Sequence, residues 1–337
     1  MNIGKRYHLK EFVYWSRRDI YMCFFVGLIP TLLYHFGFTF IAISWMPITM
    51  LGTAVAFIVG FKNNASYDRL WEARQIYGAI VNESRSFAVK ARDFNGGKKS
   101  TFTELLFNRH FAWLTFLRYQ LRESRKWETL DEPRYQEYLK NAYVIPERQE
   151  DLASSVMGFL SERELSYLLP KANRASQLLA MQSETINTLH REGALSDFQQ
   201  IQLQKSIDNL YEQQGKAERI KNFPYPRNFS SITTYLLYLF VYAMPFGLLK
   251  EFDDLGTGTF MEGWTIYFII PFTTIVGWTY ITLNAVGDSS INPFEGSAND
   301  VPITHISQMI EMDMKQMLDM EGTLLPKPVE ALNNILM

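Results

Sequence analysis

The sequence has one cysteine, Cys23, and five histidines, at positions 8, 35, 110, 190 and 305, among 337 residues. A single cysteine cannot form an intrachain disulfide and excludes zinc motifs built on CxxC pairs. The histidines lack the spacing that metal ligands require. The chain also lacks the GxGxxG, GxxxxGK[ST], HExxH and GxSxG patterns of nucleotide-binding and hydrolytic proteins. We therefore expect no cofactor and no metal, and an enzyme is the least favoured class of function.

Net charge is also nearly absent, because 33 basic residues against 35 acidic residues give −2. A chain without a basic excess gives no indication of nucleic-acid binding. Charge is missing locally as well, since no side chain from Ile20 to Phe61 carries a full charge and only His35 could acquire one. Ionisable residues in apolar segments are often functional, but a neutral, hydrogen-bonded histidine in helix packing is the favoured explanation of His35.

Apolar stretches long enough to cross a membrane occur in three places. A helix needs about 20 apolar residues to cross the hydrocarbon core. Residues 20–61 suffice for two passes, with a hairpin expected at Ser44–Pro47, because proline disfavours helix in the preceding residue and tryptophan favours the membrane interface. The other two stretches are Asn228–Leu249 and Gly263–Gly287. The sequence thus predicts four membrane helices, and the alternative is a soluble protein with buried apolar helices.

Basic residues predict the orientation of these helices. They gather before the first pass, after the second and before the third: Lys5, Arg6, Lys10, Arg17, Arg18, Lys62, Arg69, Arg74, Lys216, Arg219, Lys221 and Arg227. Lys250 is the only basic residue in the two short connecting loops. Because lysine and arginine are enriched in cytoplasmic loops, both termini and the long middle region are expected in the cytoplasm. The predicted domains are 1–61 with two membrane helices, a cytosolic region 62–227, two further membrane helices in 228–287 and a cytosolic segment 288–337.

The middle region is polar and has mainly helical periodicity. Apolar residues recur at helical spacing around 178–190, and a second helix is expected over 196–220. Gly96-Gly97, Pro133, Pro146 and Pro170 are expected to interrupt the helices.

The most informative segment joins the uncharged run to a polar block, GFKNNASYDRLWEAR, at residues 60–74. On a continuous helix Thr53, Phe57 and Phe61 lie at i, i+4 and i+8 and share one face. Small residues are interleaved with them, namely Gly52, Ala54, Ala56 and Gly60. Small residues allow close helix packing in membranes. The face is either a packing surface of a helix bundle or, around an axis shared by several subunits, an apolar constriction that gates by dewetting.

The polar block and the run before it resemble the bestrophin family of ion channels, in its bacterial branch. Two downstream segments resemble the same family in the same order. Glu218–Pro226 resembles the approach to the third membrane helix, and Ser290–Pro302 resembles the stretch that begins Asn-Pro-Phe-Gly, with Glu295 here in place of the glycine. The resemblance extends from about residue 10 to residue 320, but 95–175 matches only as generic helix.

The resemblance implies an all-helical membrane protein that forms a homopentamer in the lipid bilayer around one axial pore. Each subunit would supply four membrane helices and part of a helical cytosolic vestibule, in the inner membrane of a bacterial cell. Alignment with the family places the narrow neck of the pore at Thr53, Phe57 and Phe61. The family usually has bulky apolar residues at all three positions, so Thr53 is a departure. A cytosolic aperture is implied at Phe223, with Ile220 and Tyr225 within a one-turn error.

Six residues just inside the neck form a predicted junction collar: Asn63, Asn64, Asp68, Arg69, Glu72 and Arg74. The favoured interpretation is that the charged members form ion pairs that lock the junction. Because Asp68 and Glu72 repel each other at i, i+4, each is expected to have a basic partner elsewhere. Alternatively, these charges form rings that select the ion. The permeant ions are expected to be small and monovalent, either chloride-type anions or Na⁺-type cations.

Calcium activation of the kind implied for animal members is not expected. Their run of consecutive acidic residues is replaced here by a stretch in which Glu295 and Asp300 are the only carboxylates. Calcium prefers six to eight oxygen ligands, several of them carboxylates. Asp288 followed by serines is likewise a weak metal pattern. The alternative function is a membrane-anchored scaffold or sensor that conducts nothing and binds a partner through its helical cytosolic region.

Overall fold

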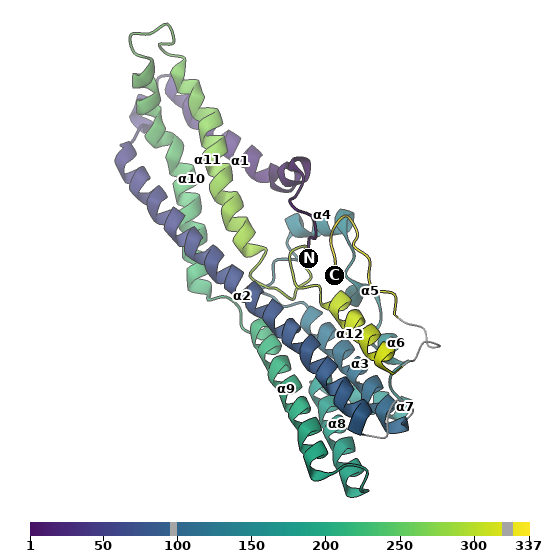
Figure 1. The fold of residues 1–337 in the computed structure, drawn as a ribbon. Coiled ribbons are helices and arrows are strands. Elements are labelled where there is room, and N and C mark those ends of the chain that lie inside the picture. Colours follow the sequence, from purple (N-terminus) through teal and green to yellow (C-terminus); the bar gives the residue numbers. More distant parts are fainter. Residues whose placement is uncertain (95–99, 319–325) are drawn as a thin grey trace. The chain divides into compact units, whose positions relative to one another are not determined.

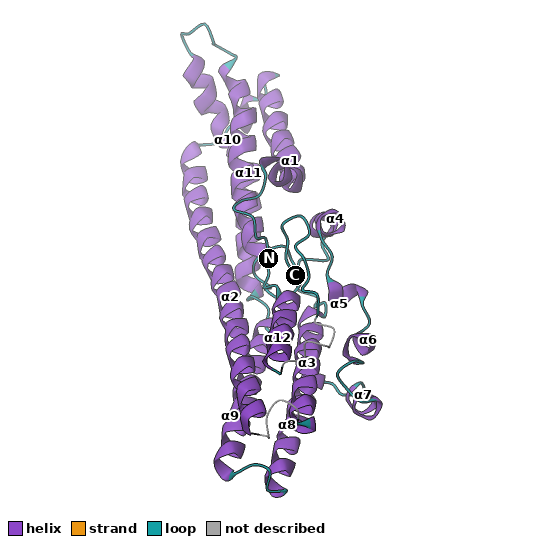
Figure 2. Ribbon diagram, turned by 45° about the vertical axis from the view of Figure 1, so that its right-hand side comes forward, coloured by secondary structure: helices purple, strands orange, loops and turns teal. Residues whose placement is uncertain are grey.

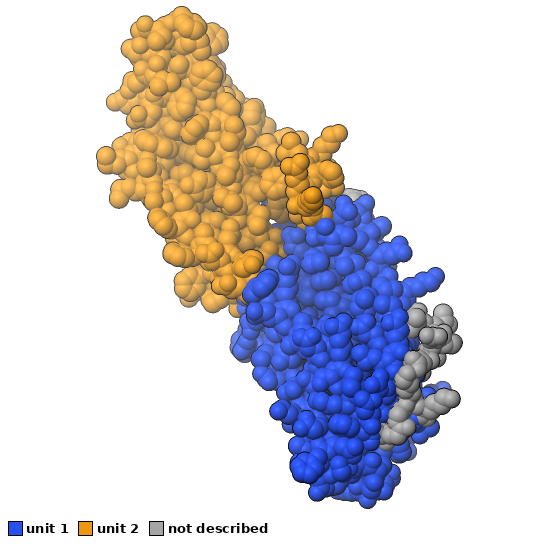
Figure 3. Space-filling model, in the orientation of Figure 1, with its two compact units in different colours: residues 1–3, 69–223, 292–337 blue, residues 4–68, 224–291 orange. Residues whose placement is uncertain are grey.

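A computed structural model of the chain describes residues 1–94, 100–318 and 326–337. Its regular structure is helical, and the β pairing in these residues consists of isolated bridges from Ile335 to Asn2 and to Leu332 (Figures 1 and 2). The prediction of a mostly helical chain is confirmed. Two compact units make up the chain, coloured separately in Figure 3. One unit comprises residues 1–3, 69–223 and 292–337, and the other comprises residues 4–68 and 224–291.

The unit of residues 4–68 and 224–291 contains the long apolar helices. These are α1 (Leu9–His35), the first part of α2 (Trp45–Phe94), α10 (Arg227–Gly256) and α11 (Ile269–Asp288), with short 3₁₀ helices η1 (Thr39–Ile41) and η2 (Thr265–Phe268). By length and composition, α2, α10 and the segment Thr265–Asp288 can each cross a membrane. In α1 the uncharged residues begin only at Ile20, after two arginines and an aspartate.

Two predicted loops are in the wrong place. The connection between the first two helices is Phe36–Ser44 rather than Ser44–Pro47, and α2 begins at Trp45. Pro47 lies in the first turn of α2, where backbone N–H groups have no intrahelical partner, so its missing donor costs no hydrogen bond. Similarly, α10 continues beyond Leu249 to Gly256, so the expected acidic loop is helical in its first half.

Small residues bring the helices of this unit close together. A Cβ atom at Gly52 would lie 2.6 Å from Cε2 of Phe240, so α2 approaches α10 more closely than a larger residue permits. A Cβ atom at Gly277 of α11 would lie 2.9 Å from the sulfur of Cys23 in α1. Val55 and Val59 of α2 are buried in the resulting apolar core. One side of α2 is therefore fixed against its own chain, and the other side points outward.

The other unit consists of helices around a second apolar core. Besides the second part of α2, it contains α3 (Thr101–Arg122), α4 (Pro133–Ala142), α5 (Pro146–Gln149), α6 (Leu152–Val156), α7 (Glu162–Leu168), α8 (Arg174–Arg191), α9 (Asp197–Asn222) and α12 (Ile303–Met317). The helix predicted over 196–220 is confirmed as α9, which Ser196 caps by accepting a hydrogen bond from the amide of Gln199.

The predicted interruptions have different outcomes. Pro133 and Pro146 begin α4 and α5, as expected for proline in a first turn, and Pro170 follows the end of α7. Gly96-Gly97 lie outside the described residues. α2 passes through Phe61–Lys62 without a break, so the polar block continues the same 50-residue helix that carries the apolar face.

Candidate functional site

The structure places Thr53, Phe57 and Phe61, here called the neck face, on the outward side of α2. Phe57 is 64% exposed and Phe61 is 70% exposed, whereas Val55 and Val59 on the opposite side are 1% and 3% exposed. Thr53 is also exposed, and its hydroxyl donates a 2.9 Å hydrogen bond to the carbonyl of Thr49. The hydroxyl is thus satisfied by its own helix. The neck face is an apolar surface that the described chain leaves uncovered.

A groove of about 510 Å³ borders the neck face within the same unit. It is lined by α2, α10 and α11 through Trp45, Thr49, Gly52, Thr53, Ala56, Phe57, Phe240, Met244, Phe272, Val276 and Tyr280. None of these side chains is charged. The surroundings of the neck face are therefore apolar, with hydroxyl groups as the main polar atoms.

The C-terminal end of the neck face is attached to α11 by Lys62 and Asn63. Lys62 is 1% exposed, and its Nζ lies 2.5 Å from the Asp288 carboxylate. The Asn63 amide donates a 3.0 Å hydrogen bond to the carbonyl of Leu283. Gly287 leaves room for Asn63, since a Cβ atom at Gly287 would lie 2.2 Å from the Asn63 Oδ1. Asp288, considered above as a weak metal pattern, is therefore engaged in an ion pair.

The remaining collar residues belong to two groups. Arg69 donates hydrogen bonds to the carbonyls of Ile220 and Phe223, at 2.9 and 3.0 Å, and so satisfies the end of α9. Glu72 forms an ion pair with Arg219. The other three, Asn64, Asp68 and Arg74, are exposed. The structure thus brings Arg69 and Glu72 together with the end of α9.

The aperture candidates have different environments. Phe223 is 67% exposed at the end of α9, and Ile220, one turn earlier, is 4% exposed. Tyr225 is half-buried and its ring lies 6.4 Å from that of Phe229. Of the three, Phe223 has the most accessible apolar side chain. His35, the titratable residue of the apolar run, is the exposed last residue of α1, with its ring 5.6 Å from that of Tyr267.

The segment Asn292–Pro302 forms a buried loop, and both of its carboxylates accept hydrogen bonds from the chain itself. Glu295 accepts hydrogen bonds from the amide and hydroxyl of Thr129, at 3.0 and 2.9 Å. Asp300 accepts from the amides of Gly296 and Ser297, at 2.7 and 2.9 Å. Gly296 has φ +101°, a conformation that glycine adopts without strain. Hydrogen bonds to its two carboxylates therefore hold the loop in one conformation.

Burial, together with the nearby carboxylates of Asp300 and Glu128, raises the pKa of Glu295 to about 8, although the hydrogen bonds from Thr129 lower it. Burial also raises the pKa of Asp300, opposed by the charge of Arg122. The folded protein therefore holds a proton on Glu295 up to a pH at which the unfolded chain, with its ordinary value of 4.5, has released it.

We expect the protein to lose stability as pH rises from about 4.5 to about 8, because the unfolded chain releases the Glu295 proton first. One proton changes the free energy of unfolding by at most about 1.4 kcal/mol per pH unit. Glu295→Gln, which is neutral at every pH, should reduce this dependence and stabilise the protein above pH 8. Thermal unfolding of both proteins at pH 5 and pH 8.5 measures the effect, and an equal loss of stability in both would contradict it.

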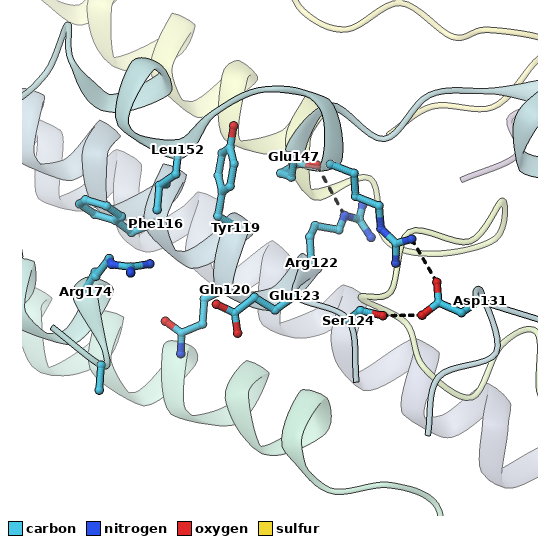
Figure 4. A pocket seen from close by; sticks show the side chains of 12 residues that line it. Phe116, Tyr119, Gln120, Arg122, Glu123, Ser124, Asp131, Glu147, Leu152 and Arg174 are labelled. Carbon is cyan, nitrogen blue, oxygen red and sulfur yellow. Dashed lines mark hydrogen bonds and ion pairs between the residues drawn. The ribbon is translucent and has the colours of Figure 1, made fainter. Parts of the chain in front are cut away.

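A pocket of about 460 Å³ lies where α3 ends, and Figure 4 shows the side chains around it. Its charged groups are largely paired. Arg122 lies 3.8 Å from Glu147, and Asp131 accepts a 2.7 Å hydrogen bond from Ser124. The side chains drawn contain neither a Ser–His nor a Cys–His pair. The pocket therefore lacks a serine or cysteine nucleophile paired with a histidine.

Comparison with known proteins gives a consistent match over most of the chain. The family model described as bacterial/fungal bestrophin protein matches residues 17–316. The voltage-dependent anion channel-forming protein YneE of Escherichia coli K12 is 26% identical over 286 residues, which are 85% of this chain and 79% of that protein. The voltage-dependent anion channel-forming protein RSc3414 of Ralstonia nicotianae is 26% identical over an alignment of 309 positions, and the match covers 86% of this chain and 87% of that protein.

Solved structures show the same fold. A crystal structure of a bacterial bestrophin homologue from Klebsiella pneumoniae superposes with a TM-score of 0.71 and 20% sequence identity. The superposition covers 91% of this chain and 98% of that one.

Proposed function

Because the chain belongs to the family of bacterial and fungal bestrophin proteins, we propose that it is a passive ion channel of the bestrophin type. Five copies surround one axial pore, and each contributes a neck face and part of a helical cytosolic vestibule. The names of the relatives, which describe anion channel-forming proteins, support this function.

The observation that carries the proposal is the uncovered neck face. Phe57 and Phe61 lie in an apolar segment, on a helix whose other side is buried against its own chain. In a ring of subunits these side chains surround the axis and form an apolar constriction, while Thr53 contributes a more polar ring at the outer end. Phe223, the exposed side chain at the end of α9, is the proposed cytosolic aperture.

The proposed topology has four membrane helices per subunit, α1, α2, α10 and α11. The basic residues at the ends of these helices favour a topology with both termini in the cytoplasm, and the inner membrane is the proposed location. The domains follow as 1–61 and 228–287 in the membrane, with 62–227 and 288–337 in the cytosol. In the collar, Arg69 and Glu72 support an anchoring role, whereas Asn64, Asp68 and Arg74 are free to face permeant ions.

The permeant ions are small and monovalent, and the names of the relatives favour chloride-type anions over Na⁺-type cations. Reversal potentials of the purified protein under a single salt gradient test this function. A potential near the chloride equilibrium value supports an anion channel, and one near the sodium value indicates a cation channel. Absence of current under every ion gradient favours the alternative, a non-conducting scaffold or sensor whose helical cytosolic region binds a partner.

Calcium is not expected to activate the channel, because neither carboxylate of the Asn292–Pro302 loop is free to bind it. Glu295 and Asp300 are buried and accept hydrogen bonds from the chain itself. We expect the reconstituted current to change less than about twofold between calcium-free and micromolar calcium solutions, since a calcium site needs several available carboxylates. A steep rise of the current over that range would contradict this expectation.

A further inference from the structure

We propose that Lys62, together with Asn284 and Asp288, is a clamp that sets the rotation of α2 and so directs the neck face toward the pore axis. The proposal rests on the proposed function in one respect, because it assigns the uncovered face of α2 to a pore. Lys62 is a positioning residue, since it acts through Phe57 and Phe61 rather than by touching the ion.

The clamp is a closed set of contacts between α2 and α11. The Lys62 Nζ lies 2.5 Å from Asp288 Oδ1 and donates a 3.0 Å hydrogen bond to Asn284 Oδ1. Asn284 in turn donates a 3.0 Å hydrogen bond to Asp288 Oδ2. The amide of Asn284 thus holds the carboxylate in place for the ammonium group.

The position of the clamp on α2 determines where the neck face points. Successive residues of a helix are rotated by about 100°, so Phe61 lies about 100° from Lys62, Phe57 about 140° and Thr53 about 180°. Attaching Lys62 to α11 therefore keeps all three residues about 100° or more around the helix from this contact. Because α2 is continuous from Trp45 onward, a rotation at Lys62 is transmitted to the whole neck face.

Burial makes this clamp selective for one rotation. The side chain of Lys62 is 1% exposed and stands directly after the uncharged run that ends at Phe61. An ammonium group buried there without its partner is strongly unfavourable, so any rotation that separates Lys62 from Asp288 is disfavoured. Val55 and Val59 add apolar contacts on the buried side of α2, but separating them from the core leaves no charge unpaired.

Cysteine labelling tests the clamp without measuring ion flow. The only native cysteine, Cys23, is buried, and Cys23→Ala gives a background free of thiols. In this background Phe57→Cys reports the outward face and Val59→Cys reports the buried face. With the clamp intact, we expect a soluble maleimide to label the cysteine at 57 at least about tenfold faster than the cysteine at 59. Lys62→Met or Asp288→Asn should bring this ratio of labelling rates, 57 to 59, toward one.

Two controls separate positioning from general loss of structure. Lys216→Met removes a partly exposed lysine that forms a 2.6 Å ion pair with Glu212 within α9, and it should leave the labelling ratio unchanged. Lys62→Arg retains the positive charge and should restore most of the ratio. If the Lys62→Met variant does not assemble, the double variant Lys62→Met, Asp288→Met is used instead. It removes both charges of the clamp and so leaves no buried charge unpaired.

The possible outcomes test the clamp and the proposed channel function separately. A ratio that collapses in the clamp variants, together with altered ion flux in liposomes, supports the proposal. A ratio that collapses while the native protein and all variants pass no ions upholds the clamp and overturns the proposed channel. An unchanged ratio in assembled Lys62→Met overturns the clamp, whatever the flux.

Discussion

Replacing Phe57 and Phe61 together with alanine is expected to raise ion flux through the reconstituted protein at least about tenfold, since each 1.4 kcal/mol removed from a barrier is a factor of ten. The reason is that a narrow apolar constriction excludes water and so opposes ion entry. Each subunit would contribute two phenylalanine side chains, which are 64% and 70% exposed in the chain, so truncation to alanine would widen the proposed constriction in every subunit at once.

The matched control is Phe25→Ala. Phe25 is 55% exposed on α1, another apolar helix, so its truncation removes a similar side chain from outside the neck face. Flux in liposomes should be unchanged in this variant. Equal flux for native protein and the Phe57→Ala, Phe61→Ala double variant would show that the neck face does not limit conduction.

Arg122→Met is expected to lower the free energy of unfolding by about 3–5 kcal/mol, the typical cost of breaking a buried ion pair by removing one partner. Arg122 donates a 3.0 Å hydrogen bond to the carbonyl of Phe294 and lies 3.7 Å from Asp300 and 3.8 Å from Glu147. Its side chain is 1% exposed, so no water replaces these contacts. The variant leaves two buried carboxylates without this cation, and denaturant-induced unfolding of the purified protein measures the loss.

An exposed arginine provides the comparison. Arg85 pairs with Asp313 at 2.6 Å, but its side chain is 50% exposed, and Arg85→Met should cost less than about 1 kcal/mol. Similar losses for the two variants would indicate that the network around Arg122 contributes no more than a surface ion pair.

Much of the fold could be predicted from the sequence, because its signals are local. Uncharged runs of membrane length indicated the segments now seen as α2, α10 and α11, and helical spacing indicated α8 and α9. Regular i, i+4, i+8 spacing also placed Thr53, Phe57 and Phe61 on one face, which requires only that the helix continue.

Other features depended on contacts between distant parts of the chain. Lys62 and Asn284 are 222 residues apart in sequence, and no local pattern shows that they meet. The sequence gives one indication of this contact, because Lys62 directly follows an uncharged run. A charged residue in that position either faces water or needs a partner of opposite charge. The same limit applies to Arg122, whose partners Glu147, Phe294 and Asp300 come from separate segments.

The loop boundaries were misplaced for a different reason. Proline disfavours helix in the preceding residue, which predicts a loop at Ser44–Pro47, yet Pro47 lies in the first turn of α2, where proline is tolerated. Ile48, directly after Pro47, is buried in the apolar core, and this contact with distant segments is not visible in the local sequence.

Chemical modification at position 57 shows whether ions pass along the neck face. In a Cys23→Ala, Phe57→Cys protein, single-channel current in a planar bilayer is recorded before and after a bulky thiol reagent is added. We predict that the current falls at least about tenfold, because the reagent fills an apolar constriction, and that the same reagent leaves a Phe25→Cys protein unaffected. A current that persists unchanged after complete modification at position 57 would contradict this account.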